Sequence, residues 1–275
     1  MLNRLVYDNI YSSSESVVWY FKGTKVSISN RQEFNKRLSL ICDTIYHSTP
    51  VFKNEMVNRT KISSQISSAR RKFVERLIEK IDQPNLGFLE SEFPPEKSIY
   101  LSLLSKTGIH VVKKSTGMLS KPVDQTYLPL WEIGLHFLST TRLKERKLTE
   151  LIEIFSLRPF KLKDGFIEFW VPVFLIATSH EYALYESQVY VPEINTDVLE
   201  LMAKRPSLFT IKAFDVTGVK LDLFQKYRSF LNQGVTKNIS SSTFIETIKP
   251  FLTFYRGLPE FTKKTNTWIT ADTIA

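Results

Sequence analysis

The sequence predicts a mainly α-helical fold with small β-hairpins (α+β), and three observations lead to that prediction. Apolar residues recur at helical spacing along much of the chain; in residues 62–81, for example, Ile66 and Phe73 fall on one face. Short aromatic and β-branched segments around polar turns indicate hairpins at residues 17–28 and 183–191. The chain has only nine glycines in 275 residues. This scarcity disfavours nucleotide-binding α/β folds, which use glycine-rich phosphate turns.

The first part of the chain, residues 1–125, is predicted to be a basic helical-bundle domain with an N-terminal hairpin. Asn30 is expected to begin a helix, because Glu33 follows three residues later in a capping-box arrangement. Residues 111–127 are rich in Lys, Ser, Thr, Gly and Pro and show no helical stripe. We therefore interpret them as a linker at the end of this domain.

The second part, residues 126–275, is predicted to be a winged-helix-like helical domain. A helix that starts near Lys147 should end at Pro159, and Asp164 should cap the next helix, over residues 166–178. A hairpin then follows. Helix, turn, helix and hairpin is the order of a winged-helix unit, although many three-helix bundles share its first three elements.

The most apolar stretch runs from Phe166 to Ala177, which is twelve residues and includes Glu168 and Pro172. A membrane span needs about 20 apolar residues, so we predict a buried helix. A helix that reads DNA presents Arg, Lys, Asn or Gln, which this stretch lacks, and we expect it to serve in packing. Glu168 either faces solvent on the first turn, where the helix dipole favours it, or marks a site; the first interpretation is preferred.

Composition and cysteine content limit the class of protein. The chain is 43% hydrophobic and 24% charged, as in globular proteins. Cys42 is the single cysteine, which excludes an intrachain disulfide and a cysteine zinc site. The N-terminus lacks the apolar stretch of a secretory signal, so a cytoplasmic location is expected. Thr270 and Asp272 stand where a helix would begin, and the chain is expected to be a portion of a longer protein.

No catalytic residue, metal site or cofactor is predicted. Neither a P-loop nor a dinucleotide-binding glycine motif is present. The four histidines fall in four different predicted elements and are interpreted as surface or helix-end residues: His47, His110, His136 and His180. Glu145 to Lys147 match the Glu-x-Lys of carboxylate-metal nucleases, but they lie on a predicted helix, and we attribute the match to chance. A nuclease would also need clustered carboxylates that the linear sequence does not reveal.

Positive charge is concentrated in the first part of the chain. Residues 1–125 carry 19 Lys and Arg against 12 Asp and Glu, whereas residues 126–275 carry 18 against 16. An anionic partner is therefore expected at the first part. The predicted nucleic-acid-binding residues cluster around a serine-rich helix start, where free N–H groups favour phosphate: Arg59, Lys61, Arg70, Arg71 and Lys72.

The alternative interpretation of this cluster is a solvated helix face with Arg71 paired to Glu75. In the binding interpretation, Arg71 and Lys72 point outward and Arg70 lies near the edge of the buried face. The cluster should then bind an anion more strongly than the linker lysines Lys113 and Lys114.

Several segments between residues 40 and 265 resemble a known group of proteins. The motifs are "TPVFKNEMVNR", the helix with paired arginines, "PPEKSIYLSLLSKTGIH", "PFKLKDGFIEFWVPVFLIA" and "LPEFTKKT". They are similar to the region outside the P-loop core of very large bacterial anti-phage defence ATPases of the BREX type. The matching polar positions have no role that the resemblance assigns: Asn54, Glu55, Asn58, Arg59, Arg70 and Arg71.

Two hypotheses for function follow. The resemblance and the basic first part imply a non-catalytic module of a phage-defence ATPase that binds nucleic acid or holds the ATPase against a partner. The partners would be nucleic acid and other defence-system proteins, or the remainder of a larger ATPase chain, with no membrane. The alternative is a protein-interaction scaffold without nucleic-acid binding, in which exposed aromatic surface makes the contact.

Overall fold

Helices dominate the computed structural model, which describes residues 17–213, 221–233 and 241–264. The α-helices of these residues are α2 (Arg31–Ile45), α3 (Ser64–Glu79), α4 (Pro95–Tyr100), α5 (Leu128–Thr140), α6 (Leu148–Ser156), α7 (Asp164–Ala177), α8 (Thr196–Lys204), α9 (Leu221–Phe230), α10 (Ser241–Gly257) and α11 (Glu260–Lys264). A π-helical turn, η3 (Leu101–Ser105), continues α4, and two 3₁₀ turns are η2 (Pro84–Gly87) and η4 (Pro206–Leu208). The prediction of a mainly helical fold is confirmed.

The strands form two separate hairpins and one antiparallel sheet. The strands are β1 (Trp19–Phe21), β2 (Thr24–Val26), β3 (His110–Lys113), β4 (Thr116–Leu119), β5 (Arg146–Lys147), β6 (Tyr182–Glu186), β7 (Val189–Val191) and β8 (Phe209–Ala213). β1 pairs with β2 and β3 with β4, while the four-stranded sheet has the order β5-β8-β6-β7. Both hairpins predicted from alternating residues, β1–β2 and β6–β7, are confirmed.

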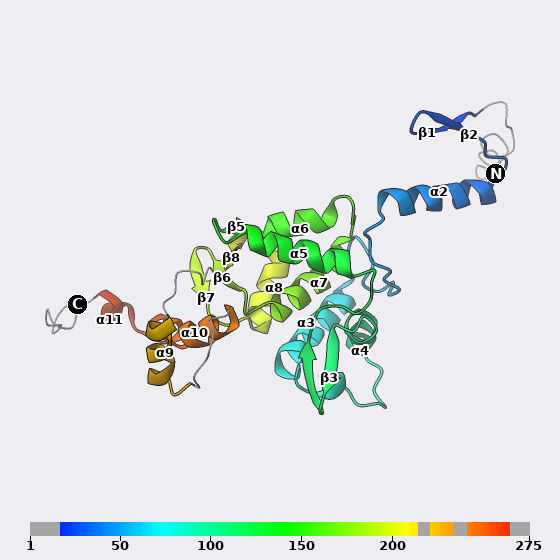
Figure 1. Cartoon of the computed structure of the whole chain (residues 1–275). Helices are drawn as coiled ribbons and strands as arrows, with labels where there is room; N and C mark the ends of the chain where they lie inside the picture. The colour runs from blue at the N-terminus through cyan, green and yellow to red at the C-terminus, as the bar shows by residue number, and fades with distance from the viewer. Residues whose placement is uncertain (1–16, 214–220, 234–240, 265–275) are drawn as a thin grey trace.

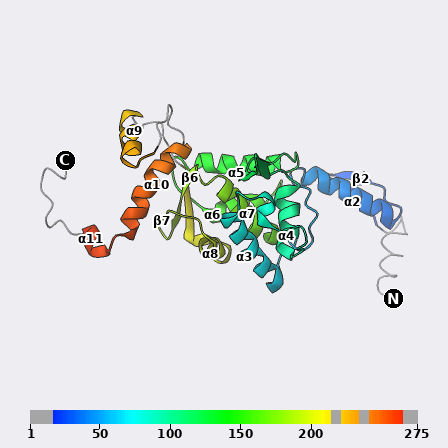
Figure 2. The ribbon, with the colours of Figure 1, turned by 90° about the horizontal axis from the view of Figure 1, so that it is seen from below.

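The elements from α3 to β8 form a central body, with smaller parts at its two ends (Figures 1 and 2). α2 and the β1–β2 hairpin lie at one end; we call them the N-terminal arm. α9, α10 and α11 lie at the opposite end and are called the C-terminal helices. The N-terminal arm stands away from the body in both views, whereas α10 lies beside β7, where Arg256 Nη1 donates to the Tyr190 carbonyl at 3.1 Å.

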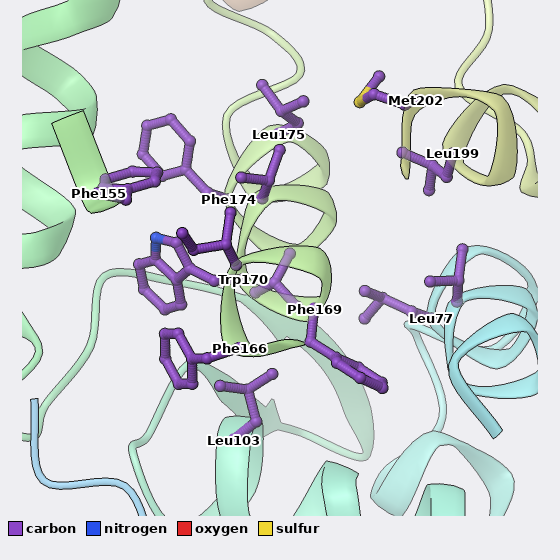
Figure 3. Packing of buried hydrophobic residues seen from close by; sticks show 14 of the residues in the cluster. Leu77, Leu103, Phe155, Phe166, Phe169, Trp170, Phe174, Leu175, Leu199 and Met202 are labelled. Carbon is purple, nitrogen blue, oxygen red and sulfur yellow. The ribbon is translucent and has the colours of Figure 1, made fainter. Parts of the chain in front are cut away.

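α7 occupies the centre of the core (Figure 3). Its residues from Gly165 to Leu175 are buried except Glu168, which fits a helix that is apolar on all sides. The indole of Trp170 lies 5.8 Å from the Tyr127 ring and 6.3 Å from the Trp131 ring, measured between centroids. The aromatic side chains of α5 and α7 therefore pack together at the centre of this core.

The core continues across the predicted domain boundary at residue 125. Phe73 of α3 packs on Phe169 of α7, with 5.8 Å between ring centroids. Phe52 packs on Phe166 at 4.8 Å. Residues from both predicted domains thus share one continuous set of buried side chains.

The interpretation of residues 111–127 as a linker is wrong. Val111 pairs with Met118 in the β3–β4 hairpin, and Lys114 and Ser115 form its turn with positive φ angles of 48° and 68°. Polar residues with positive φ make the tight turns that suit a twisted hairpin. A composition typical of a linker is therefore also the composition of this short exposed hairpin.

α6, α7 and the β6–β7 hairpin follow one another in the predicted order. Lys163 is the cap residue of α7, so Asp164 lies one position inside the helix that it was expected to cap. β8 pairs with β6 and separates it from β5, a strand that the sequence did not suggest. The winged-helix-like arrangement itself stays a prediction.

Some sequence predictions fall outside the described residues. They include the helix start expected at Thr270 and Asp272.

Candidate functional site

Arg70 lies inside the molecule rather than at the edge of its helix. Its side chain is about 6% exposed, and Nη1 donates to the Glu168 carboxylate of α7. On the other side Nη2 lies 3.3 Å from Oε2 of Glu200 on α8. The guanidinium is thus held between two carboxylates. Its predicted role as a surface group that binds nucleic acid does not fit this position.

The burial of Arg70 follows from the width of the buried stripe on α3. The stripe comprises Ile66, Ala69, Arg70, Phe73, Val74 and Leu77. Arg70 lies four residues after Ile66 and three before Phe73, so it shares their face. The sequence contained a second signal, because Glu168 is the carboxylate inside the apolar run. The preferred interpretation of Glu168 as a solvent-facing residue is replaced by its ion pair.

Arg71 and Lys72 are exposed, as predicted. Arg71 Nη2 lies 3.3 Å from Asp197 Oδ1 on α8, so its partner is not Glu75. The side chains of this pair are 56% and 85% exposed. Water and salt screen such an ion pair, and it holds the arginine only weakly.

Arg59 and Lys61 lie on a loop that contacts the first turn of α7. The Gly165 N–H donates to the Arg59 carbonyl at 2.8 Å, and Lys163 Nζ donates to the Asn58 carbonyl at 3.1 Å. A Cβ atom at Gly165 would lie 2.6 Å from the Arg59 carbonyl oxygen, so only glycine permits this approach. The loop is therefore fixed while the Arg59 and Lys61 side chains remain exposed.

The structure divides the predicted cluster into two groups. Arg59, Lys61, Arg71 and Lys72 are exposed, and Arg70 is buried. Asn54, another residue of the resemblance, is also buried; its Nδ2 donates to Ser102 Oγ at 2.9 Å. At least two of the recurring polar positions therefore serve packing rather than a surface site.

His110 is a buried residue, so its interpretation as a surface or helix-end histidine is wrong. Its Nε2 lies 2.8 Å from the Ile81 carbonyl oxygen, and its Nδ1 lies 3.1 Å from the Tyr100 hydroxyl. These contacts attach the β3–β4 hairpin to the residues that follow α3 and to the end of α4. The other three histidines are exposed.

Across the described ranges, no group of three His, Cys, Asp or Glu side chains is placed to hold a metal ion. Arg146 and Lys147 belong to β5 and not to a helix, and Arg146 Nη2 lies 2.8 Å from Glu150 Oε2. The main-chain N–H of Lys147 and the Arg146 guanidinium lower the pKa of Glu150. These residues form a helix start.

Exposed apolar side chains gather at the two ends of the molecule. α2 is amphipathic, yet it has no buried residue. Trp19 covers part of its stripe, 4.9 Å from Phe34 between ring centroids, whereas Leu38 of the same stripe stays exposed; Leu40 is exposed on another side of the helix. At the other end the exposed aromatic residues of the C-terminal helices are Tyr227, Phe230, Phe254, Tyr255 and Phe261.

No family model, curated protein or solved structure matches this chain. None of the helices within the described parts of the chain is both long enough and apolar enough to cross a bilayer.

Proposed function

We propose that this chain is a non-catalytic docking module that joins a larger assembly through the apolar surfaces at its two ends. The observation that carries the proposal is α2, a helix of 15 residues without a buried side chain. A short helix gains most of its stability in proteins from packing its apolar face. Within the described residues the β1–β2 hairpin covers this apolar face only in part, and a partner that packs on the remainder would explain it.

The C-terminal helices support the same proposal. The Phe254 side chain is 70% exposed and Phe261 79% exposed. Large aromatic residues are the usual anchors of protein interfaces. The resemblance suggests that the assembly is a bacterial phage-defence ATPase, in which this chain would hold the ATPase against a second protein.

We further propose that α6, α7 and the β6–β7 hairpin act as a winged-helix-like packing unit. A helix that reads a DNA groove needs an exposed polar face. α7 has none, because its exposed side is limited to Glu168 and the residues at its ends.

Nucleic-acid binding is the second candidate function. It is favoured by the exposed side chains of Arg59, Lys61, Arg71 and Lys72, together with Lys163 beside the same loop. Their attraction to phosphate would weaken as salt is added, whereas apolar docking would not.

In-cell photo-crosslinking tests the docking proposal. A photoreactive amino acid at Leu38 should capture a specific partner, and the Leu38→Glu, Leu40→Glu double variant should lose that partner in co-purification at high salt. The control is Leu143→Glu, since Leu143 is 96% exposed but belongs to the body. Equal partner recovery with the double variant and the control would refute docking through α2.

A further inference from the structure

A small apolar cavity lies between α6, α7 and α8. Its apolar walls include Ile152, Ile167, Val171, Leu199, Met202 and Pro206, and its volume is about 160 Å³. Figure 3 shows Leu199 and Met202 on the side of α8 that faces α7. An apolar cavity of about 150 Å³ is large enough for a benzene ring. The space therefore fits one aromatic or branched aliphatic side chain.

Two carboxylates line the same cavity. They belong to Asp164 and Glu168, which are four residues apart and share one face of α7. Asp164 is exposed, and the Glu168 side chain is about 30% exposed. The cavity is thus apolar within and acidic at one side.

The charge on this side is only partly compensated. Arg70 contacts both Glu168 and Glu200, so one guanidinium faces two carboxylates and a net negative charge remains. Asp164 adds a second negative charge. Lys163, which precedes it and donates to the Asn58 carbonyl in the loop before α3, adds one positive charge, so one net negative charge remains on this side. A cation at the cavity entrance would therefore be attracted.

We propose that the cavity binds an apolar side chain that is flanked by lysine or arginine in a segment of a partner protein. The apolar group fills the space between α7 and α8, and the cation pairs with Asp164 and Glu168. Charge complementarity selects this occupant, since an acidic segment would meet two like charges. The site is separate from the N-terminal arm and does not rest on docking through α2.

Methyl NMR on the full chain tests the proposal with defined probes. Acetyl-phenylalanyl-lysine amide is titrated while the methyl signals of Ile152, Ile167, Leu199 and Met202 are followed. Acetyl-phenylalanyl-glutamate amide and acetyl-alanyl-lysine amide are the controls. We expect the phenylalanyl-lysine probe to bind about fivefold more tightly than the glutamate probe, as one partly exposed ion pair allows.

Two variants separate the apolar and electrostatic parts of the site. Ala203→Phe, at a partly exposed cavity residue of α8, should fill the space and abolish the methyl shifts caused by all three probes. Asp164→Asn, at an exposed position, should leave binding of phenylalanine but reduce the preference for lysine to about twofold or less. Equal affinity for the lysine and glutamate probes would overturn the proposal. Persistence of the methyl shifts in Ala203→Phe would also overturn it. So would the absence of methyl shifts with every probe in the parent chain. The Leu38→Glu, Leu40→Glu variant should bind the probes normally, which distinguishes this site from the docking surface of α2.

Discussion

Arg70 and Glu168 form an ion pair within the central body although 98 residues separate them in the sequence. Glu200, 130 residues from Arg70, contacts the same guanidinium. The three residues connect α3, α7 and α8 where these helices meet. A set of charges with so little access to water contributes stability only while every member is present.

Replacing Arg70 should therefore destabilise the protein strongly. We expect Arg70→Ala to lower the free energy of unfolding by about 3–5 kcal/mol, because two glutamates lose their partner. Its neighbour offers a matched control, since Arg71→Ala breaks an exposed pair and should cost about 1 kcal/mol or less. Urea unfolding measures both. Similar losses for the two variants would contradict the burial of Arg70.

Loss of the hydroxyl group should change the free energy of unfolding in opposite directions at Tyr127 and Tyr182. Within the described residues the Tyr127 hydroxyl finds no hydrogen-bond partner, nor does the nearby Trp170 Nε1. Tyr182 donates to the Leu175 carbonyl at 2.7 Å. Tyr127→Phe should raise the free energy of unfolding by about 1 kcal/mol, and Tyr182→Phe should lower it by about 1–2 kcal/mol. Thermal unfolding of the two variants in parallel checks the signs, and a larger loss for Tyr127→Phe would contradict the assignment.

Alkaline pH should unfold the protein through the same tyrosines. Burial raises the pKa of Tyr182 well above its usual value of 10.0, and burial with the Asp124 charge also raises the pKa of Tyr127. Stability is then complete below about pH 10 and falls above it, since the unfolded chain releases these protons first. The free energy of unfolding, measured at intervals from pH 9 to 11, should decline less steeply in the Tyr127→Phe, Tyr182→Phe double variant. Parallel pH curves for the variant and the parent would contradict this cause.

Nucleic-acid binding should depend on the exposed basic residues and not on Arg70. Arg59→Ala, Lys61→Ala and Lys72→Ala together should weaken binding of single-stranded or duplex DNA about tenfold at low salt, because three phosphate contacts are lost. Filter binding at two salt concentrations measures the loss.

The control for this experiment is Lys113→Ala with Lys114→Ala, two residues at the tip of the β3–β4 hairpin. Arg70 is left unchanged, because its replacement would report unfolding. If the triple variant and the control variant lose equal DNA affinity per charge removed, the attraction is diffuse and there is no defined binding site.

Local patterns in the sequence were sufficient for most of the helices and two of the hairpins. Asn30 caps α2 as predicted: its side chain accepts from the Glu33 N–H at 2.9 Å. The Glu33 carboxylate accepts a hydrogen bond from the Ser29 N–H at 3.0 Å, and not from the Asn30 N–H as a capping box would require. Such contacts connect residues three or four apart, so the sequence alone specifies them. The aromatic run of α7 likewise required burial whatever surrounded it.

The tertiary structure decided which polar residues are buried. The spacing of Ile66, Phe73 and Leu77 located one face of α3, but only the approach of α8 made that face wide enough to enclose Arg70. In the same way, His110 became an interior residue because the residues that follow α3 lie against β3. The partner of Arg71 proved to be Asp197 and not Glu75 for a related reason, since α8 brings a carboxylate from 126 residues away. The desolvation of a charged group depends on every element around it. The apolar periodicity of one helix shows which face is buried but not which other elements pack around a given side chain. The sequence by itself therefore determined the elements and their apolar faces, whereas the packing of α3, α7 and α8 determined which charges are available at the surface.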